Sequence, residues 1–142
     1  MSDTAPVRGI VVSHGKLAEG LLDAVARITG IPEGVLVAVS NIGLSPDALV
    51  AELRRLAGGG PAIVFADMSS GSCCLAARRL LHEDPAIVVI GGVNLPILLD
   101  FVVQRDRPIQ ELAARLVEKG RAAITSVTVD LPRHGGTPLS SR

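Results

Sequence analysis

Aromatic residues are almost missing from this chain of 142 residues, which has two Phe and no Trp or Tyr. An excess of one charge is missing too, because 14 Lys and Arg balance 14 Asp and Glu. Surfaces that bind nucleic acids usually combine a basic stripe with aromatic platforms on which bases stack. We therefore expect no nucleic-acid partner.

Long apolar runs are also absent. None reaches the roughly 20 residues that a membrane-spanning helix needs. Residues 1–6 are polar and lack the apolar region of a signal peptide. We therefore expect a cytoplasmic protein with no direct insertion into a membrane.

Cysteine is scarce, and the two cysteines, Cys73 and Cys74, are adjacent. Neighbours in sequence cannot join distant segments by a disulfide, and a metal site would need further ligands. We expect reduced, buried or half-buried thiols, and neither a metal nor an organic cofactor.

Aliphatic residues dominate instead, and hydrophobic residues make up 48% of the chain. Strand-like segments at 7–13, 35–40, 62–66 and 86–90 alternate with helix-like segments. This alternation predicts an α/β fold, a doubly wound, four-stranded parallel sheet of order 2-1-3-4 with helices on both faces. The helices are expected at 17–28, 46–56, 73–82, 94–103 and 109–120, the last closed by Gly120.

The segment 123–129 is rich in β-branched residues and predicts a fifth strand at a sheet edge, either in its own subunit or in a neighbour. The chain is long enough for one domain, which we place at 7–130. Residues 1–6 and 131–142 are expected to be flexible termini.

Two polar side chains follow strands that are neighbours in the predicted order. His14 follows the first strand and Asp67 follows the third. The carboxyl ends of parallel strands meet at one edge of a sheet, where ligands collect. A carboxylate that accepts from one imidazole nitrogen raises the basicity of the other, as a nucleophilic histidine requires.

The polar loop after Asp67 leads into a helix, and Ser70, Gly71 and Ser72 lie at that junction. Unpaired N–H groups and hydroxyls there form a seat for a phosphoryl group. Each feature also has a simpler interpretation. His14 can be a turn residue, Asp67 a helix cap, and the Ser-Gly-Ser run an ordinary turn.

Three blocks resemble the enzyme IIA domain of the mannose-type sugar phosphotransferase system (PTS). They read G-I-V-V-S-H-G-K-L-A-E-G-L-L, A-D-M-S-S-G-S and G-G-V-N-L-P-I-L-L. They occur in the family's order and spacing, and the likeness spans Gly9 to Val129. The resemblance implies a phosphotransferase with a phosphohistidine intermediate.

In this resemblance, the carrier HPr phosphorylates His14 on its solvent-facing nitrogen while Asp67 holds the other nitrogen. The phosphoryl group then passes to a histidine of an enzyme IIB protein. The family forms homodimers in which the C-terminal strand joins the partner's sheet, and 123–129 fits that strand. The resemblance implies further site residues: the phosphoryl-binding Ser70, Gly71 and Ser72, and the rim residues Ser13, Gly15, Asn94, Leu95 and Pro96.

The chain departs from the family pattern in the loop after Asp67. Ser70 replaces a glycine, Cys73 replaces a proline, and Cys74 stands where a bulkier residue is usual. The altered loop raises the question of which IIB protein docks there.

Two other functions compete with the phosphocarrier. One is a regulatory phosphoprotein of the same fold, whose His14 phosphorylation controls a protein partner. The other is a thiol enzyme that uses Cys73 or Cys74 at a helix N-terminus, with His14 as its base. Replacing both cysteines by serine distinguishes the thiol enzyme from the phosphocarrier. The phosphocarrier should still accept phosphate, whereas the thiol enzyme should be inactive.

Overall fold

The computed structural model describes residues 5–32 and 34–130. The predicted termini, 1–6 and 131–142, lie outside these ranges except for residues 5 and 6. Strands and helices alternate along the chain, as predicted. The elements are β1 (Arg8–Ser13), α1 (Leu17–Thr29), β2 (Leu36–Ser40), α2 (Pro46–Ala57), β3 (Ala62–Ala66), α3 (Ser72–Glu83), β4 (Ile87–Gly91), α4 (Leu95–Gln104) and α5 (Ile109–Ala122).

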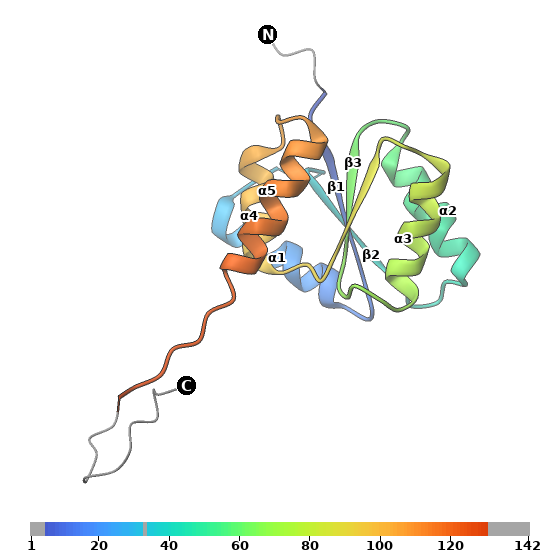
Figure 1. Cartoon of the computed structure of the whole chain (residues 1–142). Coiled ribbons are helices and arrows are strands. Elements are labelled where there is room, and N and C mark those ends of the chain that lie inside the picture. The colour runs from blue at the N-terminus through green and yellow to red at the C-terminus, as the bar shows by residue number, and fades with distance from the viewer. Residues whose placement is uncertain (1–4, 33, 131–142) are drawn as a thin grey trace.

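The sheet is parallel with the order β2-β1-β3-β4, which confirms the predicted topology. Helices α2 and α3 cover one face, and α1, α4 and α5 cover the other (Figure 1). In the register of β1 with β3, Val12 lies opposite Ala66. The two strands therefore end side by side, and the residues that follow them emerge at one edge.

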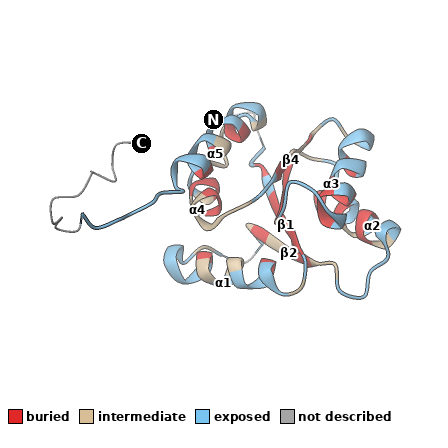
Figure 2. Cartoon of the chain, turned by 60° about the horizontal axis from the view of Figure 1, so that its bottom comes forward, coloured by how far each residue is buried: buried red, intermediate tan, exposed pale blue. Residues whose placement is uncertain are grey.

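Both faces of the sheet are covered, and β1 is buried along all but its first residue (Figure 2). Ile10 and Val12 pack toward α2 and α3, whereas Val11 packs toward the opposite layer. All five residues of β3 are fully buried. The two phenylalanines meet edge to face, with ring centroids 5.3 Å apart, so the aromatic content of the chain is concentrated in one contact.

Side chains cap the starts of two helices. The Ser45 hydroxyl accepts from the amide of Ala48, and Pro46 occupies the first turn of α2. The Asn94 side chain likewise accepts from the amide of Ile97 at the start of α4. These caps fix where the helices leave the sheet edge.

The prediction that Gly120 closes the last helix is wrong, because α5 continues to Ala122. Gly120 is buried where α5 crosses α4, and a Cβ there would lie 2.6 Å from Cγ1 of Ile97. The Asn94 side chain also donates to the Gly120 carbonyl at 3.1 Å. This glycine therefore permits close helix packing and does not end the helix.

The segment after α5 leaves the body of the protein (Figure 1). Residues 124–130 form no strand, and Ile124, Val127 and Val129 are 77%, 89% and 80% exposed. Of the two predicted alternatives for 123–129, the one in which this segment forms a strand in the sheet of its own chain is therefore wrong. Across the described ranges, no helix has the length and apolar character needed to cross a membrane.

Candidate active site

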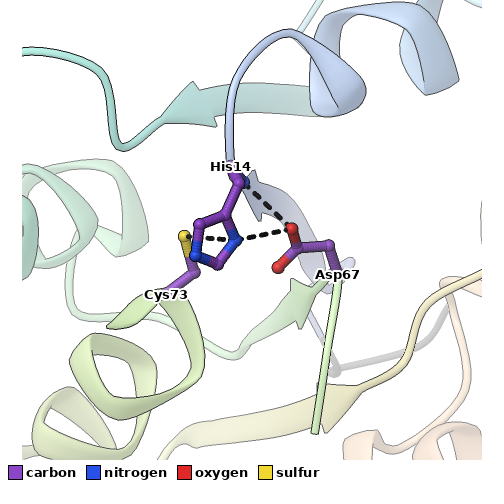
Figure 3. A group of neighbouring side chains, drawn as sticks. All are labelled: His14, Asp67 and Cys73. Atoms are coloured by element: carbon purple, nitrogen blue, oxygen red, sulfur yellow. Dashed lines mark hydrogen bonds and ion pairs between the residues drawn. The ribbon is translucent and has the colours of Figure 1, made fainter. Parts of the chain in front are cut away.

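His14 and Asp67 meet at the carboxyl edge of the sheet, as predicted (Figure 3). The Asp67 amide donates to the carbonyl of Val12 at 3.2 Å, so the chain after β3 stays against the end of β1. From there Oδ2 of Asp67 accepts from the His14 amide at 3.0 Å and lies 2.8 Å from ring Nδ1. Residues 53 positions apart are thus joined by two hydrogen bonds.

The Asp67 carboxyl is held in its ionised form. Burial is the largest influence on its pKa and acts to raise it. The hydrogen bonds from the His14 amide and ring, together with charge attraction to His14, outweigh burial and lower the pKa of Asp67. An ionised acceptor beside Nδ1 favours the tautomer with its proton on Nδ1.

The other ring nitrogen of His14 is then left with a lone pair. The His14 side chain is 45% exposed, and Nε2 lies 3.3 Å from the hydroxyl oxygen of Ser72. An oriented imidazole with one nitrogen held and the other accessible is suited to nucleophilic attack. The geometry therefore places a potential nucleophile, Nε2 of His14, at the carboxyl edge of the sheet.

The N-terminus of α3 faces this nucleophile. Its N-cap is Gly71, which has no side chain to accept from the first N–H groups of the helix. A Cβ at Gly71 would lie 3.6 Å from Cε1 of His14, so the backbone passes directly beside the ring. Free N–H groups and the positive end of the helix dipole favour an anion here.

Gly91, the last residue of β4, allows the loop after β3 to lie close to the sheet. A Cβ at Gly91 would meet Cα of Ser69 at 2.7 Å and the carbonyl oxygen of Met68 at 3.1 Å. Any larger residue would displace this loop. Because the loop joins Asp67 to α3, Gly91 helps to place both beside His14.

Cys73 also lies beside His14, with Sγ 3.8 Å from Nδ1 (Figure 3). It is fully buried, and burial, followed by the negative charge of Asp67, raises the pKa of its thiol. Cys74 is also buried and donates to the Ser69 carbonyl. A thiol enzyme needs an accessible thiolate, so this environment disfavours that hypothesis.

Comparison with known proteins identifies the family. The family model described as "PTS system fructose IIA component" matches residues 9–119. The chain belongs to this family, and the resemblance seen in the sequence is confirmed.

Curated relatives and solved structures agree. The chain is 29% identical over 124 residues to the "PTS system mannose-specific EIIAB component" of Escherichia coli (strain K12) and of Shigella flexneri. The alignment covers 83% of this chain and 38% of each relative, so the chain spans less than half of their length.

Among solved structures, the mannose/sorbose specific IIA subunit from Enterococcus faecalis has a TM-score of 0.76 and 28% identity, covering 92% of this chain and 99% of that one. Component EIIA from Streptococcus agalactiae has a TM-score of 0.78 at 23% identity, covering 84% and 96%, which supports the fold alone.

In this mannose-type IIA chain, the predicted residues flanking His14 support the turn. Ser13 is fully buried, and its hydroxyl accepts from the amide of Ala18 at 2.7 Å, which anchors the start of α1. Gly15 has a φ of +58° and donates its amide to the side chain of Asn41 at 3.2 Å. Asn41 was not predicted, although it follows β2 as Asp67 follows β3.

The remaining predicted residues lie around these groups. Asn94 is occupied in capping α4 and in its hydrogen bond to α5, and Leu95 and Pro96 form the first turn of α4. Ser70 is exposed in the loop before α3. The hydrogen-bonding groups brought to the His14 ring thus come from Asp67, Ser72 and Cys73, the last expected beside His14 only under the thiol-enzyme alternative.

Proposed function

We propose that this chain is a phosphocarrier that accepts a phosphoryl group from phospho-HPr on Nε2 of His14 and passes it to a IIB protein. The observation that supports this most directly is the 2.8 Å contact between Nδ1 and Oδ2 of Asp67, with the ring 45% exposed. The proposed working unit is a single cytoplasmic domain, residues 7–130.

The proposed transfer is a displacement at phosphorus. The lone pair of Nε2 forms the new P–N bond while the P–N bond of phospho-HPr breaks, and that electron pair returns to the HPr imidazole. The positive charge that develops on the His14 ring is stabilised by Asp67 through Nδ1–H. The phosphoryl oxygens face the Ser72 hydroxyl and the free N–H groups of α3.

The test is the intact mass of the protein after incubation with phosphoenolpyruvate, enzyme I and HPr. We expect one acid-labile phosphoryl group on the wild type and none on His14→Ala. No addition in the presence of demonstrably active HPr contradicts the proposal. Addition of equal extent to His14→Ala contradicts the assignment of His14.

The second half of the proposal concerns the acceptor. Phosphorylated protein, freed of HPr, should lose its phosphoryl group when a mannose-type IIB protein is added, and the IIB protein should gain it. Phosphorylation without transfer to any IIB protein encoded beside this chain would favour the regulatory alternative, in which phospho-His14 controls a protein partner.

We also propose that the chain functions as a homodimer in which residues 123–129 pair with the partner's sheet. Three apolar side chains in this segment are more than three-quarters exposed, and β4 is an edge strand of the sheet. A single chain therefore leaves apolar side chains in solvent and the outer backbone groups of β4 without a neighbouring strand. Sedimentation should give a dimer for the full chain and a monomer for Val127→Pro, because proline removes a ladder donor. A dimeric Val127→Pro variant would contradict the exchange.

A further inference from the structure

Three potential metal ligands of different chemistry converge on one point in the site. His14, Asp67 and Cys73 come from the ends of β1 and β3 and the start of α3, and their ligand atoms all lie within 4.8 Å of one another (Figure 3). Sγ of Cys73 is 3.8 Å from Nδ1 of His14. Ligand atoms around a tetrahedral Zn²⁺ are separated by about 3.5 Å, given bonds of about 2.0–2.3 Å.

A second observation points to a ligand at this place. The Asp67 side chain is only 7% exposed, and its second oxygen, Oδ1, is buried with no hydrogen-bond partner among the described residues. A buried carboxylate oxygen without a donor is unfavourable. Oδ2 takes both hydrogen bonds from His14, so Oδ1 is the Asp67 oxygen left without a partner among the described residues.

We propose that His14, Asp67 and Cys73 form an inhibitory site for a thiophilic divalent cation such as Zn²⁺. One sulfur, one imidazole and one carboxylate form a ligand set that suits zinc and is poor for Mg²⁺ or Ca²⁺. Three protein ligands leave the fourth tetrahedral position to water. Of the two adjacent cysteines only Cys73 belongs to this site, and the fold brings His14 and Asp67 beside it as the other two ligands.

Occupation of this site would make Nε2 of His14 unreactive. The thiol proton passes to solvent when sulfur binds the cation. The ring proton leaves Nδ1 for solvent, which breaks its hydrogen bond to Oδ2 of Asp67, and the cation takes the Nδ1 lone pair that this frees. Nε2 takes up a proton from solvent, so the imidazole stays neutral. Nε2 then has no lone pair to attack phosphorus. This consequence rests on the proposed phosphocarrier function, whereas binding of the cation does not.

The first experiment titrates Co²⁺, as a spectroscopic substitute for Zn²⁺, into the reduced full chain. A sulfur-to-cobalt charge-transfer band in the near ultraviolet and tetrahedral bands in the visible are expected for the wild type. Cys73→Ser and Cys73→Ala should lose the charge-transfer band. Cys74→Ser, the matched control at the adjacent buried thiol, should keep it.

Absence of the charge-transfer band from the wild type overturns the inference, and so does a band that survives in both Cys73 variants or disappears in Cys74→Ser. Circular dichroism of each variant separates loss of a ligand from loss of the fold. If Cys73→Ser does not fold, Cys73→Ala carries the comparison.

The second experiment measures phosphorylation by phospho-HPr after preincubation with Zn²⁺. We expect the wild type to be slowed at least tenfold and chelation to restore the rate, while Cys73→Ser is slowed less than twofold. Equal slowing of both proteins overturns the inhibitory role. A cobalt band without any phosphorylation in the absence of metal would instead contradict the proposed function and leave the metal site standing.

Discussion

Both hydrogen bonds that His14 sends to Asp67 end on the same carboxylate oxygen, Oδ2, one from the main-chain amide at 3.0 Å and one from ring Nδ1 at 2.8 Å. The amide bond fixes the position of the backbone, and the ring bond fixes the orientation and tautomer of the imidazole. One oxygen therefore controls both where the nucleophile is and which of its nitrogens can react.

Replacing Asp67 by Asn should slow phosphorylation of His14 by about 100-fold or more, within the range typical of lost acid–base assistance. A neutral amide still occupies the space but no longer stabilises the charge that develops on the ring. The measurement is the rate of phosphoryl transfer from phospho-HPr. Asp47→Asn, which removes only an exposed ion pair with Arg79, should leave the rate unchanged, and equal rates for both variants would refute the role given to Asp67.

The free energy of unfolding should depend on pH through the ionisation of the same carboxylate, Asp67. The pKa of Asp67 is lowered in the folded state, so the folded state prefers the ionised form. The corresponding stabilisation is present above the unfolded-state pKa of about 4 and is lost as pH falls through the lower folded-state pKa. Urea unfolding of wild type and Asp67→Asn from pH 7 to pH 2 should show the two free energies of unfolding converging in acid. A constant difference would contradict this assignment.

Gly71 should be intolerant of a side chain for reasons of backbone conformation. Its φ of +92° and ψ of 177° lie in a region open almost only to glycine. Gly71→Ala should lower the free energy of unfolding by about 1–3 kcal/mol. Gly20→Ala is the matched control, because Gly20 is helical with open space around it, and it should stabilise the protein by about 0.5–1 kcal/mol. Thermal or urea unfolding checks both, and a neutral Gly71→Ala would show that the loop relaxes freely.

The parallel sheet was predictable from local patterns, and the pairing of His14 with Asp67 followed from the predicted strand order 2-1-3-4, which sets the first strand beside the third. Aliphatic runs mark strands buried on both faces, and a polar residue just after a strand must lie at the carboxyl edge of the sheet. The contact of Asn41 was not predicted, and the contact of Cys73 with His14 was expected only under the thiol-enzyme alternative, which did not distinguish Cys73 from Cys74. Asn41 satisfies the same rule as Asp67, because it directly follows β2, whereas the approach of Cys73 to His14 depends on the angle at which α3 leaves the loop.

Gly120 shows a different limit. In sequence it resembles a helix terminator, and its actual role is visible only when α4 lies against it. The sequence of α5 alone does not reveal that Ile97 of α4 occupies the space where a Cβ at position 120 would lie.

The contact between Gly120 and Ile97 can be tested by a double-mutant cycle. Gly120→Ala should destabilise the protein by about 1–3 kcal/mol through overpacking, because its Cβ would lie 2.6 Å from Cγ1 of Ile97. Ile97→Ala leaves a cavity that the new methyl group partly fills, so the double variant should be more stable than the sum of the two single changes predicts. A coupling of about 1 kcal/mol or more in urea unfolding is expected. Strict additivity would show that the cost of Gly120→Ala does not come from its contact with Ile97.

The register of β1 with β3 has a consequence for quality control. Side chains alternate between the faces of a sheet, so a slip of one residue in this pairing would turn Asp67 away from His14. The reactive tautomer therefore exists only in molecules whose central strands have paired correctly. Under the proposed function, chains whose central strands are mispaired should therefore accept phosphoryl groups poorly, so the fold itself would keep the phosphoryl supply for correctly folded copies.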